Sequence, residues 1–137
     1  MGVSQLIVLD THILLWWVSG DRKLSTKAKR AITKHQDQER SILISSISAW
    51  EIGMLVHRGR LTLNMDADSW LAEVDKIPAV EFVPVDNSVG VKSTCLPGDF
   101  HKDPADRMIV ALARHTSYPL ITADEKILAY KHVKTLW

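Results

Sequence analysis

The stretch Leu6-Ile7-Val8-Leu9-Asp10 decides the fold, because four consecutive apolar residues are followed at once by an acidic one. A short apolar run without alternation is typical of a strand buried on both faces, as in a parallel sheet covered by helices. In an open parallel sheet, binding sites form beyond the carboxyl ends of the strands, which is where Asp10 stands. The stretch therefore predicts a central strand and, directly after it, one side of a functional site.

Similar apolar runs recur along the chain and alternate with helical patterns. Strands are predicted over residues 6–9, 42–44, 80–85, 120–122 and 133–136, and helices over residues 13–18, 25–40, 46–57, 67–75, 88–93 and 103–115 and just after 124. Strands that alternate with helices imply right-handed crossovers and a parallel sheet. The predicted fold class is α/β, a three-layer α/β/α sandwich with a central, mostly parallel sheet of four to five strands.

Length and composition favour one globular domain. The chain has 137 residues, of which 46% are hydrophobic and 24% charged, so a single domain is expected over residues 1–137. Apolar runs such as residues 13–18 are far shorter than the roughly 20 residues that cross a bilayer, so no membrane partner is expected. Cys95 is the only cysteine, which excludes an intramolecular disulfide and a cysteine zinc cluster and favours a cytoplasmic location.

Net charge by itself does not indicate a nucleic-acid partner. Seventeen Lys and Arg residues stand against sixteen Asp and Glu, a formal net charge of +1, without the domain-wide positive charge typical of such binders. If four of the acids hold cations, however, seventeen basic residues face twelve free acidic ones. Overall neutrality can therefore conceal a moderately basic protein around an acidic site.

Four acidic residues stand at the edge of the sheet where strands lead into helices. Asp10 follows the first strand, and Glu51 lies near the start of the helix after the second. Asp106 lies near the start of the helix that leads to the fourth strand, and Asp124 follows that strand. Because parallel strands end at a common edge, these carboxylates are expected to converge there.

Each of these acids also has a simple structural explanation. Residues 48–51 (Ser-Ala-Trp-Glu) match a capping box, in which the glutamate bonds back to the start of the helix. Asp103 before Pro104 is an ordinary N-cap that places Asp106 in the first turn, and the two remaining acids can cap the helices that follow them. Taken singly, such residues are more often structural, so the functional interpretation depends on their convergence.

Divalent metal ions resolve the repulsion among converging carboxylates. All-oxygen ligand sets suit the hard cations Mg²⁺ and Mn²⁺, and one or two such ions are expected here. Two ions about 3.5–4 Å apart activate a water molecule and stabilise the leaving oxygen in phosphodiester hydrolysis.

The same acids lie in motifs that resemble the PIN domain, specifically the VapC-type toxin ribonucleases of type II toxin–antitoxin systems. In the order in which that family has them, the motifs are Leu9-Asp10-Thr11-His12 with Leu14-Leu15-Trp16, Ser48-Ala49-Trp50-Glu51-Ile52, His57-Arg58-Gly59-Arg60-Leu61, Asp103-Pro104-Ala105-Asp106-Arg107 and Leu120-Ile121-Thr122-Ala123-Asp124. They extend over essentially the whole chain, and five motifs in this order with family-like spacing are specific.

The resemblance implies a metal-dependent endoribonuclease that acts on RNA and is held inactive by a cognate antitoxin protein. By position, Asp10 and Asp106 correspond to the central metal ligands of the family. Glu51 and Asp124 complete the acidic set, directly or through water. Asp103 is taken first as a helix cap and second as a group that supports the ligands.

Three further side chains close to the acids need an assignment. Thr122 can hydrogen-bond a ligating carboxylate, although a hydroxyl at a strand end often bonds only backbone. Arg107 directly follows a predicted ligand and either contacts an RNA phosphate or pairs with Asp103. His12 is expected on the surface of its helix rather than in a zinc site.

The first helix carries adjacent tryptophans, Trp16 and Trp17, which make it apolar on all sides. Such a helix needs burial on more than one face. One face packs into the core, and the other meets a second subunit of a homodimer or an antitoxin helix, near Trp50. In the other interpretation the helix is fully internal.

Two alternative functions fit the same sequence. A non-catalytic α/β interaction domain would use the acids only as caps. A PIN nuclease in RNA processing or DNA cleavage outside a toxin–antitoxin pair would share the same site. Substitution of Asp by Asn separates the first alternative from a nuclease, because Asn remains a good N-cap but is a poor Mg²⁺ ligand.

Overall fold

The computed structural model describes residues 5–137 and has a five-stranded parallel sheet at its centre. The strands are β1 (Ile7–Leu9), β2 (Ile42–Ser45), β3 (Val80–Val83), β4 (Leu120–Ile121) and β5 (Thr135–Leu136). Their order across the sheet is β3-β2-β1-β4-β5, and all four neighbouring pairs are parallel. The predicted fold class is therefore confirmed.

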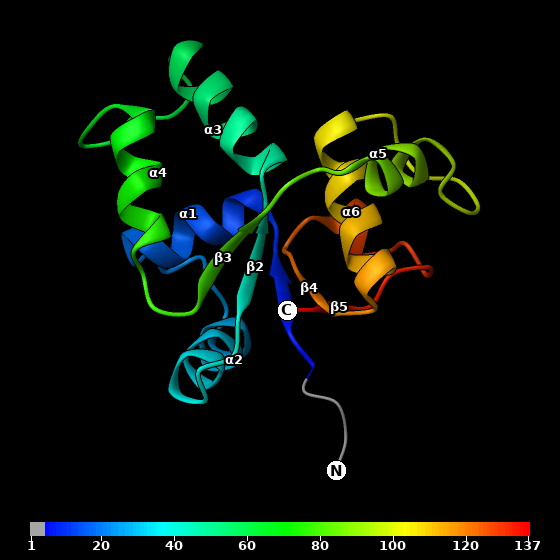
Figure 1. Ribbon diagram of the computed structural model, residues 1–137, viewed down its shortest axis with the longest axis horizontal. Helices are drawn as coiled ribbons and strands as arrows, with labels where there is room; N and C mark the ends of the chain where they lie inside the picture. Colours follow the sequence, from blue (N-terminus) through cyan, green and yellow to red (C-terminus); the bar gives the residue numbers. More distant parts are fainter. Residues whose placement is uncertain (1–4) are drawn as a thin grey trace.

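Seven helices of the described chain connect these strands and cover both faces of the sheet (Figure 1). They are α1 (Thr11–Ser19), α2 (Thr26–Asp37), α3 (Ile47–His57), α4 (Ala67–Asp75), α5 (Asn87–Thr94), α6 (Pro104–Thr116) and α7 (Glu125–Leu128). Among residues 5–137, no helix has the length and apolar character needed to cross a membrane.

The two faces of the sheet form two separate cores. Ile7 and Leu9 pack with buried residues of α1, α2, α3 and α4, whereas Val8 packs with buried residues of α5, α6 and α7. Successive side chains of a strand point to opposite faces, so a strand between two helical layers must be apolar at every position. This geometry explains the uninterrupted apolar run at the start of the chain.

The strand β1 lies at the centre, where the order of the strands reverses direction along the sheet. Its last residue, Leu9, is in register with Ile44 of β2 and with Ile121 of β4. The chain continues from β1 to one side of the sheet and returns on the other side through β4. Asp10 therefore enters the crevice at this switch point, the position where open α/β sheets bind ligands.

Two predicted helix boundaries are wrong. The helix α2 ends at Asp37 rather than near residue 40, because Glu39 adopts a left-handed conformation with φ 53°. The helix α1 starts at Thr11 rather than at residue 13, because Asp10 is its N-cap.

The helix α3 starts at Ile47 directly after its predicted N-cap Ser46, which makes no side-chain capping bond. The capping box predicted over residues 48–51 is therefore absent from this described helix.

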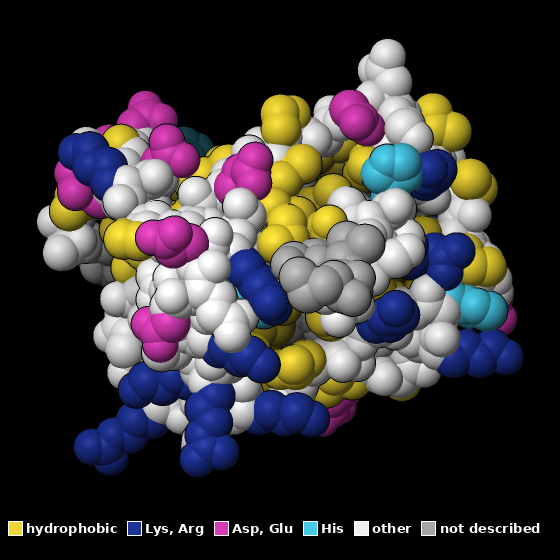
Figure 2. Space-filling view, turned by 60° about the horizontal axis from the view of Figure 1, so that its bottom comes forward, with side chains coloured by type: hydrophobic (Ala, Val, Ile, Leu, Met, Phe, Trp, Pro, Cys, Tyr) yellow, Lys and Arg dark blue, Asp and Glu magenta, His cyan; other side chains and the backbone are white. Residues whose placement is uncertain are grey.

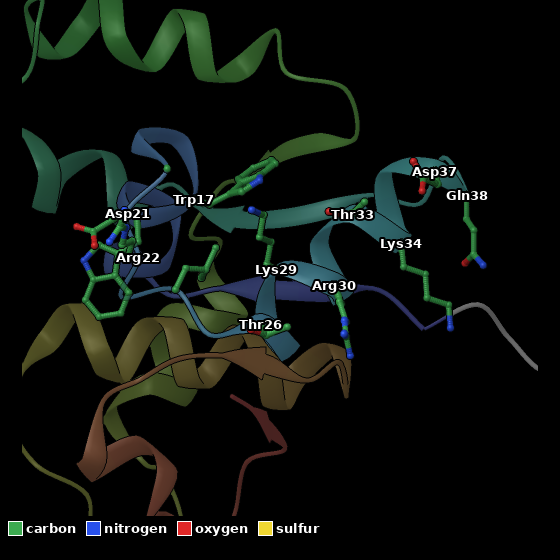
Figure 3. A pocket seen from close by; sticks show the side chains of 13 residues that line it. Trp17, Asp21, Arg22, Thr26, Lys29, Arg30, Thr33, Lys34, Asp37 and Gln38 are labelled. Carbon is green, nitrogen blue, oxygen red and sulfur yellow. The ribbon is translucent and has the colours of Figure 1, made fainter.

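Partial burial of α1 overturns the interpretation that this helix is fully internal. Ile13 and Leu14 are inaccessible to solvent, whereas Trp16 and Trp17 are only half-buried. Both tryptophans line a cavity of about 820 Å³ between the end of α1 and α2, together with basic side chains such as Lys29 (Figure 3).

Charged groups are unevenly distributed over the surface. Figure 2 brings the bottom of Figure 1 forward and shows many Lys and Arg side chains gathered along the lower part of that face. Among the residues of α2, Lys27, Lys29, Arg30 and Lys34 are all exposed. A protein that is almost neutral overall therefore carries a locally basic surface.

The buried face of α6 yields a prediction about stability. Ile109 is fully buried between α6 and the sheet, so Ile109→Ala should lower the free energy of unfolding by about 2–5 kcal/mol, measured by urea denaturation. The matched control is Val91→Ala on α5, where the side chain is 66% exposed. Its effect should stay within about 0.5 kcal/mol, and equal losses in both variants would contradict the assignment of this core.

Candidate functional site

A pocket of about 240 Å³ opens at the carboxyl edge of the sheet, beside the start of α1. Its lining includes five carboxylates, those of Asp10, Glu51, Asp103, Asp106 and Asp124. The other lining residues are Thr11, His12, Leu15 and Leu55, so no Lys or Arg side chain lines the pocket. The structure thus brings together all the acids that the sequence places at this edge.

Asp10 is the most deeply buried of these acids, at 2% exposure. It caps α1, and its Oδ1 accepts a hydrogen bond of 2.8 Å from the amide of Thr11. Its Oδ2 accepts a bond of 2.7 Å from the hydroxyl of Thr122. The carboxylate is therefore held in one orientation by two donors, one from each of two neighbouring strand ends.

Thr122 supports a second acid as well. Its side chain is fully buried, and its hydroxyl oxygen accepts a bond of 3.0 Å from the amide of Asp124. The predicted bond from this hydroxyl to a carboxylate of the acidic set is confirmed. Because one hydroxyl contacts both Asp10 and the turn that carries Asp124, it fixes these two residues relative to each other.

Glu51 is the fifth residue of α3 and points into the pocket without the predicted capping role. Ser48, the residue expected to pair with it, instead bonds the hydroxyl of Thr11 at 2.8 Å. Oxygen Oε1 of Glu51 is buried and has no hydrogen-bond partner within the described chain. A buried carboxylate oxygen without a donor is costly, and a cation would satisfy it.

Asp103 and Asp106 bring two more carboxylates to Glu51 from the start of α6. One oxygen from each of the three residues lies within 4.8 Å of the others. Asp103 is the N-cap, and its Oδ1 accepts a bond of 3.0 Å from the amide of Asp106. The cap interpretation of Asp103 is thus confirmed, but the same residue is also part of the tightest acidic cluster.

Asp124 likewise combines a cap with a place in the pocket. Its Oδ1 accepts bonds from the amides of Lys126 and Ile127, at 2.9 and 3.1 Å. Within residues 5–137, the donors to Asp124 and to Asp103 reach only the Oδ1 atoms. Each of these two caps therefore keeps a second oxygen that can bind a ligand.

His12 lies in the pocket, so its predicted surface position is wrong. Its Nε2 accepts a bond of 3.1 Å from the amide of Ala123, which leaves the ring proton on Nδ1. That Nδ1 lies 3.5 Å from Oδ2 of Asp10. The only sequence signal for this role was the two-residue spacing from Asp10.

Within the described residues, Arg107 does not pair with Asp103, one of its two predicted roles. Its guanidinium donates to the carbonyl oxygens of Ser93, Phe100 and His101, at 2.7, 3.1 and 3.2 Å. Arg107 thus fixes the segment before α6, including His101, whose Nε2 lies 3.0 Å from Oδ2 of Asp106.

Burial and mutual repulsion raise the pKa of three of the carboxyl groups. Burial is the main cause for Asp10, whose pKa is raised despite the opposing effects of His12 and Thr122. The pKa of Glu51 is raised for the same reason. Burial, followed by the charges of the neighbouring acids, raises the pKa of Asp106 to about 8. The pocket therefore favours either protons or another source of positive charge.

A divalent cation fits this donor set. Hard cations prefer carboxylate oxygens, and the pocket offers several that are buried or free of protein donors. Positive charge there would remove the repulsion that raises the pKa of Asp106. Asp10, Glu51, Asp106, Asp103 and Asp124 are the residues able to hold it.

The chain matches known proteins over nearly its whole length. The family model described as PIN domain matches residues 7–133. Ribonuclease VapC22 of Mycobacterium tuberculosis (strain ATCC 25618 / H37Rv) is 32% identical over 133 residues, which cover 96% of this chain and 98% of that protein.

Solved structures with the same fold have lower sequence identity. VapBC2 from Rickettsia felis, bound to a DNA fragment from its promoter, has a TM-score of 0.70 at 16% identity and covers 96% of this chain and 97% of that chain. DNA-bound VapBC from Salmonella typhimurium has a TM-score of 0.68 at 16% identity and covers 97% and 98%. VapC20 of Mycobacterium tuberculosis, a Sarcin-Ricin loop cleaving toxin, has a TM-score of 0.61 at 16% identity and covers 93% and 98%.

The raised pKa values predict how stability depends on pH. A carboxyl group whose pKa is higher in the folded state stabilises the fold fully below its ordinary pKa, near 4, and this contribution is lost as the pH rises through the folded value. In EDTA, the melting temperature should therefore fall between pH 5 and pH 8.5, since the pKa of Asp106 is about 8.

Variants test whether Asp106 causes this loss. Asp106→Asn should flatten the pH dependence of the melting temperature in EDTA, because it removes the carboxyl group whose pKa burial and the neighbouring acids raise. Asp75→Asn on α4 removes an exposed carboxylate far from the pocket and should leave the dependence unchanged. An Asp106→Asn variant with the full wild-type slope would contradict this account of the site.

Proposed function

The chain belongs to the PIN domain family, and we propose that it is a Mg²⁺- or Mn²⁺-dependent endoribonuclease, the toxin of a type II toxin–antitoxin pair. Residues 1–137 would form one nuclease domain. The observation that carries the proposal is the pocket at the carboxyl edge of the sheet, where five carboxylates converge without a Lys or Arg. The similarity to a VapC ribonuclease over 96% of the chain supports the same activity.

In this proposal the acids hold one or two ions, with Asp10, Glu51, Asp106 and Asp124 as the main ligands. Asp103 joins them because its carboxylate lies in the tightest cluster with two of these residues. A bound divalent ion would polarise the phosphate and lower the pKa of a water molecule. The chain itself contributes fixed ligand orientations, through the donors that hold Asp10 and Asp124.

The remaining side chains in the pocket favour hydrolysis by water over covalent catalysis. Thr11 shares its hydroxyl hydrogen bond with Ser48 inside the protein, and His12 already accepts a backbone bond on Nε2. Among the lining residues there is no cysteine or serine to act as a nucleophile. The expected RNA products therefore carry a 5′-phosphate and a 3′-hydroxyl.

A cognate antitoxin is the proposed protein partner, and two of the structural neighbours are VapBC proteins solved with DNA. The partially exposed outer side of α1 remains the predicted contact surface for an antitoxin helix or for the second subunit of a homodimer. Trp50, at 55% exposure, adds apolar area to the surface of α3. We propose a cytoplasmic location, because the proposed RNA substrate and the proposed antitoxin are both made in that compartment.

Substitution of the deepest acid tests the activity. Asp10→Asn should lower the rate of RNA cleavage in Mn²⁺ by about a thousandfold, because metal binding supplies several kcal/mol of transition-state stabilisation. The fold should persist, since Asn is a good N-cap. Cleavage is measured by mapping the 5′ ends of RNA fragments, and circular dichroism checks the fold.

The matched control is Asp86→Asn, which changes the N-cap of α5 away from the pocket and should leave cleavage intact. Unchanged cleavage by the Asp10→Asn variant would favour the alternative in which the acids are only caps. Products that end in 2′,3′-cyclic phosphate would refute attack by water.

The shared hydroxyl of Thr122 gives a second, finer test. Thr122→Val keeps the shape of the side chain but removes the bond to Asp10, so Mn²⁺ affinity measured by calorimetry should fall about 10–100-fold. Thr122→Ser retains the hydroxyl and should recover most of that affinity. Equal Mn²⁺ affinities for Thr122→Val and wild type would show that this hydroxyl does not position the ligand.

A further inference from the structure

A second cavity, of about 510 Å³, lies beside the acidic pocket and differs from it in chemistry. It is formed by the segment before α6 and by the chain from α7 to the residues before β5. The aromatic and basic side chains that line it are Phe100, His101, Lys126, Tyr130, Lys131 and His132. This volume lies within the range of about 300–1,000 Å³ that is typical of small-molecule sites.

Aromatic rings line this cavity in a connected series. The ring centroids of Phe100 and Tyr130 are 4.8 Å apart, those of Phe100 and His101 4.5 Å, and those of Tyr130 and His132 5.3 Å. Tyr130 is buried, whereas Phe100 and His132 are half-buried and therefore leave part of their rings accessible. Exposed aromatic faces of this kind stack with nucleobases irrespective of base identity.

Positive charge is available at the same cavity. Lys126 and Lys131 are exposed and line it, against one acidic residue, Asp99. The combination of ring faces with lysines is typical of surfaces that bind single-stranded nucleic acid. It contrasts with the neighbouring pocket, which is lined by carboxylates without Lys or Arg.

The walls of the cavity are held in place by internal bonds. Arg107 donates to the carbonyl oxygens of Phe100 and His101, and the hydroxyl of Tyr130 donates to the carbonyl oxygen of Pro97. Gly98 has a positive φ of 65°, and a Cβ there would lie 3.3 Å from Nε2 of His132. Such anchoring lowers the entropic cost of binding a ligand.

Two residues connect this cavity directly to the acids. Nε2 of His101 lies 3.0 Å from Oδ2 of Asp106, and the amide of Lys126 donates to Oδ1 of Asp124 at 2.9 Å. His101 and Lys126 themselves line the second cavity. A strand that places a phosphate at the acidic pocket would therefore have its adjoining nucleotide beside these rings.

We propose that this cavity binds an unpaired nucleotide of the RNA substrate next to the scissile phosphate. The base stacks on the accessible faces of Phe100 and His132, and the adjoining phosphates lie near Lys126 and Lys131. Single-stranded or splayed-out bases are the form in which proteins read RNA, because paired bases are hidden in the helix. The inference rests on the proposed ribonuclease activity, and it adds a subsite that orients the substrate.

The test measures RNA binding and RNA cleavage separately. Binding of a fluorescein-labelled single-stranded RNA of mixed sequence is followed by anisotropy in the Asp10→Asn background, where the RNA stays intact. Phe100→Leu preserves apolar packing but removes the stacking face, and should weaken binding about tenfold. Lys126→Gln with Lys131→Gln should lower the slope of log affinity against log salt by about 0.7 per phosphate contact.

A control variant removes the same charge elsewhere. Lys27→Gln with Lys76→Gln changes two exposed lysines on α2 and just after α4, and should leave both the affinity and the salt slope near their starting values. Circular dichroism melting confirms that Phe100→Leu folds. Lys126 and Lys131 are exposed, so their substitution tests the proposal even if Phe100→Leu disturbs the loop.

The outcomes separate this inference from the proposed function. Unchanged RNA affinity in both the Phe100 and the lysine variants overturns the subsite, even if wild-type protein cleaves RNA. An equal loss in the Lys27 and Lys76 control also overturns it. Weakened binding confined to the cavity variants supports the subsite even if wild-type protein cleaves no RNA, in which case only the proposed activity fails.

Discussion

Repulsion among carboxylates at one edge of the sheet is the constraint on which the rest of the site depends. The fold reduces this repulsion with groups of its own: α1 and α6 both start at the pocket, and the positive ends of their helix dipoles face the acids. Amide and hydroxyl donors then hold Asp10 from two neighbouring strand ends. These contributions do not remove the cost of the charges, because burial and then the neighbouring acids still raise the pKa of Asp106 to about 8. The pocket is therefore arranged for a cation that the polypeptide does not provide.

The fold could be predicted from the sequence because its decisive property is local. A strand between two helical layers must be apolar at each position. Ile7, Val8 and Leu9 are all apolar, and all three are buried. The acids could be placed at one edge by the same logic, since strand ends of a parallel sheet share an edge. Apart from the bond of the Thr122 hydroxyl to a carboxylate of the pocket, interactions between residues distant in the chain could not be predicted in this way. Ser48 bonds Thr11 rather than closing a capping box, His12 is fixed by Ala123, and Arg107 binds carbonyl oxygens that no side-chain pattern reveals.

In the sequence, each acid could be either a helix cap or a metal ligand. The structure shows that one aspartate can have the geometry for both roles. An aspartate has two carboxylate oxygens, and a helix cap needs only one of them. Asp103 and Asp124 use Oδ1 to hold the amides at the start of their helices. The second oxygen of each can bind a ligand, and the cap fixes the direction in which it points. Capping here orients the acids of the pocket instead of competing with their chemistry.

The attachment of Arg107 has a consequence for how such a protein can change over evolutionary time. The guanidinium of Arg107 bonds the end of α5 and the segment before α6 through backbone carbonyl oxygens, which every amino acid possesses. Positions 100 and 101 can therefore exchange their side chains without losing the anchor, while the helix that carries Asp106 keeps its place. The hydrogen bonds that Arg107 makes are thereby independent of the side chains at positions 100 and 101, which line the proposed nucleotide subsite.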